Sequence, residues 1–268
     1  MLTVLIILLL LCIVYLFAVM GRVGHKGLPK LRGWNYAHRG LHGEGVPENS
    51  MAAFRAALEA GYGIELDVHL LKDGTLAVMH DSALKRTTGC DGNIEDLTAG
   101  QLKDYHLQGT GETIPLFQDV LELYAGKAPL IIELKAAGGN HDALTKAACD
   151  MMASYNGVYC VESFDPRCVL WLRKNRPDII RGQLSENFLA TGGNMPWLLK
   201  FAMTYNLCNF ATQPDFVAYK FCDRNTFSNT LTRKFWNVQG VSWTLRSKED
   251  YNEAVKEGWI PIFENFRP

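Results

Sequence analysis

The stretch Ile64-Glu65-Leu66-Asp67-Val68-His69 alternates between apolar and polar side chains. Successive side chains of a β-strand point to opposite faces of the sheet. If helices cover the outside of the sheet, the three apolar residues face those helices. Glu65, Asp67 and His69 then face inward, where ionised groups are costly unless something compensates their charge. The pattern therefore predicts a sheet covered by helices and a polar site inside it.

Other β-rich runs alternate with longer amphipathic stretches along the rest of the chain, which is typical of a parallel sheet covered by helices. Residues 34–268 suit a (β/α)8 barrel, which typically has about 250 residues. A doubly wound open sheet is the alternative, but no Gly-rich dinucleotide or phosphate loop supports it. The predicted strands are Tyr36–His38, Ile64–His69, Leu76–Met79, Leu130–Leu134, Val158–Val161, Ile179–Gln183, Phe216–Tyr219, Val241–Leu245 and Ile260–Phe263. The predicted helices include Ser50–Ala60, Asp142–Tyr155, Pro166–Asn175 and Lys248–Glu257.

A second strand repeats the inward polar pattern. In Ile131-Ile132-Glu133-Leu134-Lys135 the alternation places Glu133 and Lys135 inside the barrel. Glu65, Asp67 and Glu133 would then converge near the strand ends. Each acid alone could be a strand-end residue neutralised by a surface cation, but three at inward positions favour a metal site. A divalent cation compensates their repulsion, and all-oxygen ligands favour Mg²⁺ or Ca²⁺ over zinc.

Two histidines lie where a strand gives way to a loop: His38 precedes Arg39, and His80 precedes Asp81. Histidine exchanges protons near neutral pH, and cleavage of a phosphodiester needs one proton acceptor and one donor. Either histidine alone could be an ordinary loop residue. Arg39 and Lys135 would add positive charge beside the carboxylates, where a phosphate group could bind.

Residues 1–20 contain no charged side chain, and such a length of apolar helix matches the thickness of a bilayer core. No basic segment or small-residue cleavage site supports a cleaved signal peptide, so a transmembrane anchor is expected. Basic residues follow the apolar run, which predicts a single-pass membrane protein with a cytoplasmic catalytic domain. The expected organisation is an anchor over residues 1–20, a tether over 21–33 and one catalytic barrel over 34–268.

At these residues the chain resembles the glycerophosphodiester phosphodiesterase family. The matching motifs span nearly all of residues 34–268 in the family's order, and the His-Arg-Gly, Glu-x-Asp and His-Asp series is the most specific part. The motifs are Ala37-His38-Arg39-Gly40, Pro47-Glu48-Asn49-Ser50, Glu65-Leu66-Asp67-Val68, Lys72-Asp73-Gly74, His80-Asp81, Arg86-Thr87-Thr88-Gly89, Ile114-Pro115, Ile132-Glu133-Leu134-Lys135, Ser163-Phe164-Asp165-Pro166 and Trp243-Thr244.

The resemblance implies a phosphatidylinositol-phospholipase-like barrel that hydrolyses glycerophosphodiesters to sn-glycerol 3-phosphate and an alcohol through a cyclic phosphate. It implies one Mg²⁺ or Ca²⁺ ion. The implied roles are metal binding by Glu65, Asp67 and Glu133, acid-base catalysis by His38 and His80, phosphate binding by Arg39 and Lys135, and a further site carboxylate at Glu48. Trp243 is expected either to form a wall of the glycerol pocket or to lie in the core.

One motif departs from the family's pattern, because the last strand is followed by Glu264-Asn265-Phe266 instead of Thr-Asp-aromatic-Pro. Glu264 could replace the aspartate, although it is one methylene longer.

Two other functions are compatible with the sequence. A membrane anchor would suit a lysophospholipase D that acts on lysolipid diesters, and the apolar stretch Met195–Phe201 could form a rim for an acyl chain, or a barrel helix that faces the core. The protein could also be a catalytically inactive, membrane-tethered binding protein, but none of the five key residues is replaced. The expected partner is a small-molecule diester. Nucleic acid is not expected, because the formal net charge is only -1.

Overall fold

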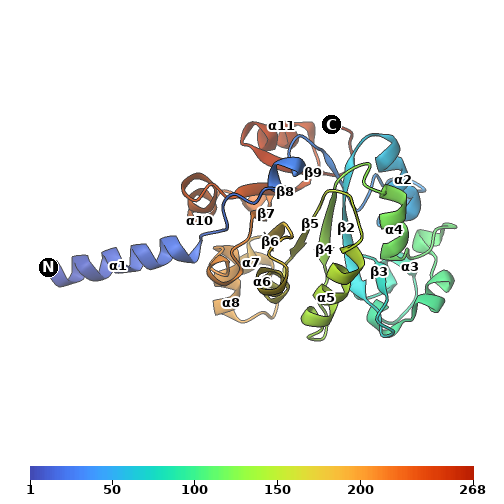
Figure 1. Ribbon diagram of the computed structural model, residues 1–268, viewed down its shortest axis with the longest axis horizontal. Helices are drawn as coiled ribbons and strands as arrows, with labels where there is room; N and C mark the ends of the chain where they lie inside the picture. Colours follow the sequence, from blue (N-terminus) through green and yellow to red (C-terminus); the bar gives the residue numbers. More distant parts are fainter.

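The computed structural model describes residues 1–268 and contains a closed barrel of eight parallel strands (Figure 1). Strand β1 pairs with both β2 and β9, which closes the barrel. This arrangement confirms the predicted (β/α)8 class, and every predicted strand is present with its ends within two residues. The barrel strands are β1 (Tyr36–His38), β2 (Gly63–Leu70), β4 (Leu130–Leu134), β5 (Tyr159–Ser163), β6 (Arg181–Ser185), β7 (Phe216–Lys220), β8 (Gln239–Leu245) and β9 (Trp259–Phe263).

Helices surround the barrel, and short 3-10 turns fill several of the connections. The four predicted helices are all present, with ends within three residues. The α-helices are α1 (Leu2–Ala18), α2 (Met51–Glu59), α3 (Lys85–Thr88), α4 (Phe117–Tyr124), α5 (His141–Met152), α6 (Pro166–Asn175), α7 (Phe188–Thr191), α8 (Trp197–Thr204), α9 (Asn209–Thr212), α10 (Phe227–Thr230) and α11 (Lys248–Lys256). The remaining turns are η1 (Leu28–Leu31), η2 (Ile94–Asp96), η3 (Ala99–Asp104), η4 (Leu107–Gly109), η5 (Phe221–Asp223) and the π-helical turn η6 (Leu231–Phe235).

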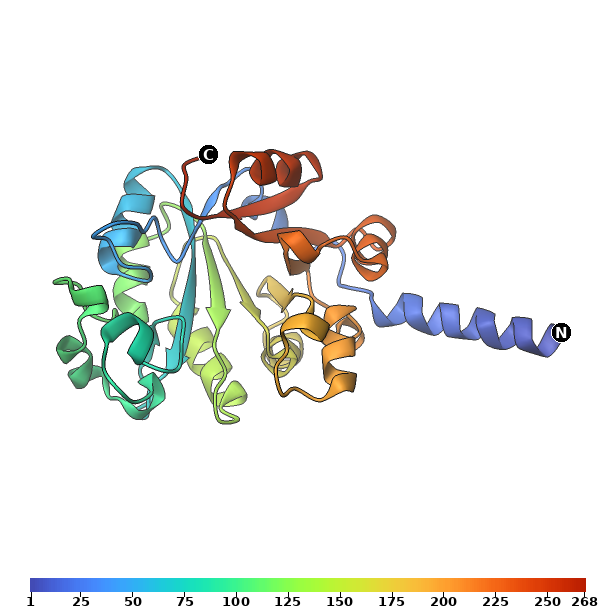
Figure 2. The same ribbon diagram turned by 180° about the vertical axis from the view of Figure 1, so that it is seen from behind.

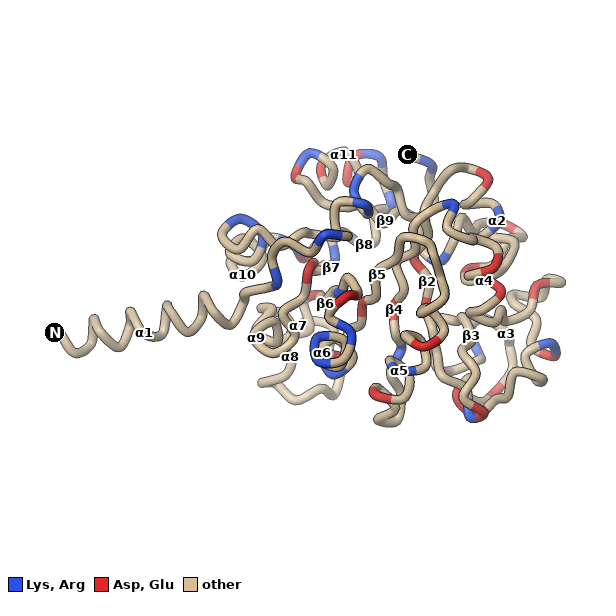
Figure 3. The backbone as a smooth tube through the Cα atoms, in the orientation of Figure 1, with Lys and Arg blue, Asp and Glu red and all other residues tan.

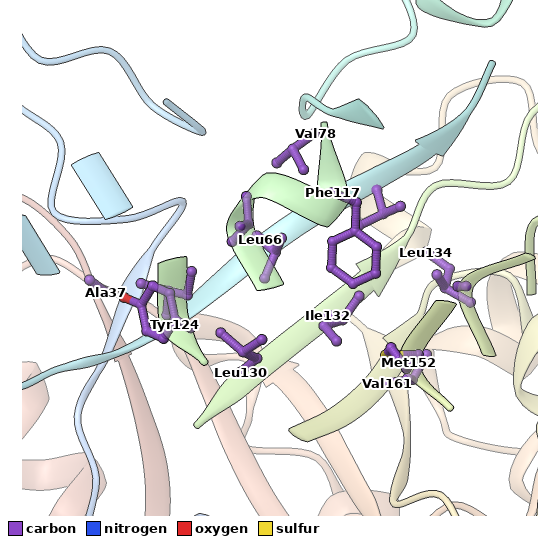
Figure 4. Packing of buried hydrophobic residues seen from close by; sticks show 14 of the residues in the cluster. Ala37, Leu66, Val78, Phe117, Tyr124, Leu130, Ile132, Leu134, Met152 and Val161 are labelled. Atoms are coloured by element: carbon purple, nitrogen blue, oxygen red, sulfur yellow. The ribbon is translucent and has the colours of Figure 1, made fainter. Parts of the chain in front are cut away.

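The outward faces of the strands form the main apolar core. Leu66 of β2 and Ile132 of β4 pack in one cluster with Phe117 and Tyr124 of α4 (Figure 4). Removing such side chains from water stabilises the fold by about 1.5–3 kcal/mol each. The alternation predicted from the sequence is therefore correct, and the opposite face of each strand is directed into the barrel.

Strand β3 (Leu76–Val78) lies outside the barrel and pairs with β2 in antiparallel orientation. It belongs to a lobe formed by residues 71–116, which has its own small apolar core around Ala77, Leu102 and Ile114. This lobe adjoins the carboxyl end of β2. Its attachment there brings the loop after β3, with His80, close to the barrel mouth.

The prediction of a transmembrane anchor over residues 1–20 is not supported. Helix α1 covers only 17 residues, and no helix of the structure is both long and apolar enough to cross a membrane. The helix ends at Ala18 because the next residues dock on the barrel: Val19 is fully buried, and its carbonyl accepts a hydrogen bond from Thr232 Oγ1 at 3.0 Å. The cytoplasmic position of the catalytic domain was inferred from that span and stays a prediction.

Helix α1 projects away from the barrel (Figure 2) and carries no charged side chain (Figure 3). The segment 21–33, expected to be a tether, packs along the barrel. Arg22 forms an ion pair with the buried Asp215 at 2.5 Å, and Leu28 and Leu31 belong to the apolar cluster inside the barrel.

Candidate active site

Three buried carboxylates meet on the inner face of neighbouring strands. Glu65 and Asp67 lie on β2, and the parallel register places Glu133 of β4 beside Asp67. An oxygen atom of each lies within 4.8 Å of the other two, and the three residues are at most 6% exposed. The convergence predicted from the alternation of side chains is therefore present in the structure.

Two cations and one amide surround the carboxylates. Lys135 Nζ lies 2.7 Å from Glu133 Oε1 and 2.9 Å from Asp67 Oδ1. Arg39 Nε lies 3.6 Å from Asp67 Oδ2, and Asn49 Nδ2 donates a hydrogen bond to the same oxygen at 2.8 Å. Asp67 is thus the best compensated of the three acids.

The charges of Glu65 and Glu133 are not fully compensated. Burial, together with the neighbouring carboxylates, raises the pKa of both residues above the ordinary glutamate value. Burial is the largest single effect on Asp67 and raises its pKa, but Lys135, His80, Arg39 and the hydrogen bond from Asn49 together lower the pKa below the ordinary aspartate value. Three oxygen donors that repel one another in a sheltered position form a donor set that fits a hard divalent cation.

His38 ends strand β1 and is almost fully buried. Its Nδ1 lies 3.2 Å from Glu264 Oε2, and its Nε2 lies 3.8 Å from Glu65 Oε2. Burial lowers the pKa of His38, and the hydrogen bond to Glu264 opposes this effect. A neutral imidazole that donates its Nδ1 proton to Glu264 presents an unprotonated Nε2 toward the carboxylate site.

His80 has a similar arrangement in the loop after β3. Its Nδ1 lies 2.6 Å from Asp81 Oδ1, and Arg86 Nε donates a hydrogen bond to the other oxygen of Asp81 at 2.5 Å. Burial, with Lys135 and Arg39, lowers the pKa of His80 to about 4, so the imidazole is neutral at pH 7. Each histidine therefore has a carboxylate on Nδ1 and leaves Nε2 available.

Glu48 lies between two guanidinium groups. It accepts hydrogen bonds from Arg39 Nη1 at 2.9 Å and from Arg86 Nη2 at 2.7 Å. The pKa of Glu48 is lowered because these arginines outweigh its burial. Glu48 therefore connects the arginine beside the carboxylates to the arginine that holds Asp81.

The turn after β1 depends on a glycine. Arg39 and Gly40 both have positive φ, at 55° and 81°. A Cβ atom on Gly40 would lie 2.8 Å from the Cβ of Ala53 in helix α2, so a larger residue would push the turn away. This close approach lets the backbone N–H of Arg39 donate a hydrogen bond to Glu65 Oε2 at 3.1 Å.

Trp243 lies at the barrel mouth and is only half-buried. Its ring packs edge-on against Phe164 with the centroids 5.5 Å apart, and its indole N–H donates to the carbonyl of Ala218 at 3.2 Å. A cavity of about 30 Å³ is lined by Trp243 together with both histidines and two of the carboxylates. Trp243 therefore forms a wall of this cavity, and it also packs against the apolar cluster inside the barrel.

A second, larger cavity of about 740 Å³ adjoins the first and shares His80, Glu133 and Phe164 with it. One side is polar and includes Lys135. The other side is apolar and is formed by Phe188, Met195, Leu199 and Met203. The site thus opens into a space with a distinctly hydrophobic side.

Comparison with known proteins identifies the family. Residues 38–266 match the glycerophosphoryl diester phosphodiesterase family. The chain belongs to this family. A glycerophosphodiester phosphodiesterase of Caldanaerobacter subterraneus is 32% identical over 235 residues, which cover 83% of this chain and 89% of the relative. A human lysophospholipase D is 35% identical over 133 residues, which cover 45% of this chain and 41% of the relative.

Solved structures related to the glycerophosphoryl diester phosphodiesterase family have the same fold. A phosphodiesterase of Oleispira antarctica, solved in complex with the product sn-glycerol-3-phosphate, superimposes with a TM-score of 0.73 at 20% identity, covering 89% of this chain and 94% of that one. A glycerophosphodiester phosphodiesterase of Thermotoga maritima gives a TM-score of 0.67 at 24% identity, covering 86% and 93%. At sequence identities of 20% and 24%, this structural similarity supports the shared fold only.

Within this glycerophosphoryl diester phosphodiesterase barrel, the structure adds residues that sequence reasoning left without a role. Asp81, Arg86 and Asn49 hold His80 or Asp67, and all three lie inside the matching motifs. Glu162 of β5 is buried beside Glu133 in the register of the sheet, lines the smaller cavity and has one oxygen without a hydrogen-bond partner. Its inward position follows from the alternation in Cys160-Val161-Glu162-Ser163, a signal that could have been used.

Proposed function

We propose that this protein hydrolyses glycerophosphodiesters to sn-glycerol 3-phosphate and an alcohol. One observation carries the proposal: two histidines, both with Nε2 available, line one small cavity at the mouth of the barrel together with Glu65 and Glu133, and Lys135 joins Glu133 to the third carboxylate, Asp67. Membership of the glycerophosphoryl diester phosphodiesterase family and the activities named for the relatives support it. The charges match a phosphodiester, which needs positive charge for its oxygens and two groups that move protons.

In this proposal Glu65, Asp67 and Glu133 hold one divalent cation, Mg²⁺ or Ca²⁺. When bound, the ion supplies positive charge that stabilises the charge developing on the phosphoryl oxygens. The all-oxygen donor set and the repulsion among the three acids support this assignment. Lys135 keeps Asp67 and Glu133 in place and adds a compact positive charge for a phosphate oxygen.

His38 and His80 form the proposed acid-base pair. One neutral imidazole accepts a proton at Nε2 from the attacking hydroxyl group. The other, once protonated, donates a proton from Nε2 to the leaving alkoxide. Glu264 and Asp81 accept the Nδ1 protons, which orients both rings and stabilises each imidazolium ion as it forms. A water molecule then opens the cyclic phosphate with the roles of the two histidines reversed.

The remaining predicted residues bind or position the substrate. Arg39 offers a guanidinium fork for a phosphate oxygen, and Glu48 fixes the direction of that fork. The flat ring of Trp243 packs against the glycerol part and limits how much water reaches it. Arg39 and Trp243 line the smaller cavity, and Glu48 accepts a hydrogen bond from Arg39, which supports these assignments.

Release of glycerol 3-phosphate from glycerophosphocholine and glycerophosphoethanolamine tests the proposal. The purified full chain is treated with a chelator, and Mg²⁺ or Ca²⁺ is then added back. Activity that returns with one of these ions and is lost in His38→Ala supports the diesterase mechanism. A folded protein that releases no glycerol 3-phosphate with either ion would contradict it.

A second candidate, hydrolysis of lysolipid diesters in the manner of a lysophospholipase D, is favoured by the apolar side of the larger cavity. Helix α8 leaves Trp197 and Leu198 at 64% and 75% exposed, and Leu199 lines the cavity. These residues belong to the Met195–Phe201 stretch considered as a rim. Choline release from lysophosphatidylcholine, compared between the wild type and Leu199→Asp, tests this candidate. A loss confined to the lysolipid would support it, and an equal loss with glycerophosphocholine would contradict it.

A further inference from the structure

Three donor side chains form a second cluster where the first and last strands of the barrel meet. One donor atom from each of His38, His42 and Glu264 lies within 4.8 Å of the other two. His38 Nδ1 is 3.2 Å from Glu264 Oε2, and His42 Nε2 is 3.6 Å from Glu264 Oε1. Neighbouring ligand atoms around a tetrahedral zinc ion are about 3.4 Å apart, given metal–ligand distances of about 2.0–2.1 Å. The cluster thus already has nearly the spacing of a metal site.

The diesterase chemistry gives no reason for His42 to be here. Its Nε2 atom is buried but has no hydrogen-bond partner. A buried nitrogen without a partner is costly, and native structures contain few of them. The side chains of His42 and Glu264 are only 15% and 14% exposed, so the cluster is sheltered but not fully closed to solvent.

We propose that His38, His42 and Glu264 form a second metal site, for a zinc-type ion, that inhibits the enzyme. Two imidazole nitrogens and one carboxylate leave a fourth position open, which is a donor set that zinc accepts. The all-oxygen set of Glu65, Asp67 and Glu133 instead suits a harder ion. The two sites therefore select different metals by the chemistry of their ligands.

Inhibition follows from the nitrogen of His38 that the ion would occupy. In the proposed reaction His38 donates its Nδ1 proton to Glu264 and exchanges protons at Nε2. A metal ion on Nδ1 uses the lone pair of that nitrogen and leaves the remaining ring proton on Nε2. His38 can then no longer accept a proton there. This part of the proposal depends on the proposed function, whereas metal binding itself does not.

Substitution of Arg246 provides a control that should change metal affinity in the direction opposite to substitution of His42. Its Nη2 lies 2.8 Å from Glu264 Oε2, and its side chain is 59% exposed. Its positive charge opposes a divalent ion on the same carboxylate. Arg246→Gln should therefore strengthen metal binding at the cluster, and His42→Gln should weaken it. Neither side chain is part of the proposed catalytic or substrate-binding groups.

Cobalt(II) is the probe for binding, because four-coordinate cobalt absorbs visible light far more strongly than six-coordinate cobalt. The chelator-treated full chain is saturated with Mg²⁺ and titrated with Co²⁺. We expect a strong visible band in the wild type, the same band at lower cobalt concentration in Arg246→Gln, and none in His42→Gln. Circular dichroism checks that each variant is folded. No band in the wild type, or an unchanged band in His42→Gln, would overturn the site.

Zinc inhibition of diester hydrolysis is then measured on the same proteins. The zinc concentration for half-inhibition should rise at least about tenfold in His42→Gln, as expected when a metal site is disrupted. It should fall in Arg246→Gln, while both variants keep wild-type activity without zinc. Equal zinc sensitivity in all three proteins would overturn the inhibitory role. If no protein is active with any metal, the proposed function fails, but the cobalt spectra still decide whether the site exists.

Discussion

Replacing Glu264 is expected to impair catalysis through His38 without removing a group that touches the substrate. The carboxylate accepts the Nδ1 proton of His38 at 3.2 Å. A hydrogen bond to a charged partner contributes about 1.5–3 kcal/mol, and each step of about 1.4 kcal/mol is tenfold in rate. Glu264→Ala should therefore lower kcat/KM roughly 10- to 100-fold. Glu264→Gln keeps an acceptor but loses the charge, so its loss should be smaller.

The assay is kcat/KM for glycerol 3-phosphate release at saturating Mg²⁺, in buffers freed of transition metals so that the second metal site does not contribute. Arg246→Ala is the matched control, because this exposed residue contacts the same carboxylate. Exposed ion pairs contribute only about 0–1 kcal/mol, so the control should stay close to wild type.

Coupling to His38 separates positioning from a general loss of structure. In a His38→Ala background, removal of Glu264 should have no further effect on kcat/KM, since there is no imidazole left to orient. An equal further loss in that background would refute the reasoning. So would wild-type activity in Glu264→Ala.

Other expectations follow from the same site and from the core. Asp67→Asn should remove the increase in Tm that Mg²⁺ or Ca²⁺ gives the wild type, as measured by thermal unfolding; an unchanged increase would place the ion elsewhere. Burial lowers the pKa of His80 from 6.5 to about 4, so the protonated form appears only at low pH. The acid limb of kcat/KM should accordingly lie below pH 6.5, and a limb above that value contradicts the assignment. Because the pKa values of Glu65 and Glu133 are raised, metal binding should release protons from these carboxyl groups. Metal affinity should therefore fall as pH falls. Calorimetry in buffers of different ionisation enthalpy measures the number of protons released. A Cβ on Gly182 would lie 2.1 Å from the Phe216 ring, so Gly182→Ala should lower the free energy of unfolding, measured in urea, by about 1–3 kcal/mol. Gly111→Ala is the control and should have little effect, because no atom lies within 4 Å of the added Cβ.

Much of the fold could be predicted because apolar and polar side chains alternate along β2 and β4, as expected for strands of a barrel covered by helices. Each has an apolar face for the helices and a polar face for the interior, and the parallel register then brings Asp67 and Glu133 together. The position of the carboxylate cluster could be predicted in the same way, because the side-chain alternation in β2 and β4 is enough to place its three residues inside the barrel.

The parts that could not be predicted depend on contacts between distant segments. The bond between His38 and Glu264 joins residues whose relative position is set only when the barrel closes. The end of the N-terminal helix at Ala18 could not be predicted either. It depends on a tertiary contact, in which Val19 is buried against Thr232, and sequence periodicity does not report such contacts. The apolar side of the larger cavity has the same origin, since it combines α7, α8 and the loop before α8.

The pairing of His38 with Glu264 also links activity to the closure of the barrel during folding. The two residues are 226 positions apart in the chain. Contacts of such long range carry a large loop-closure cost and form late, after local helices and neighbouring strands. A collapsed intermediate with every other strand in place would still have an unoriented His38. Turnover during refolding therefore reports when β1 meets β9, and hydrolysis of a simple diester becomes a kinetic signal for barrel closure.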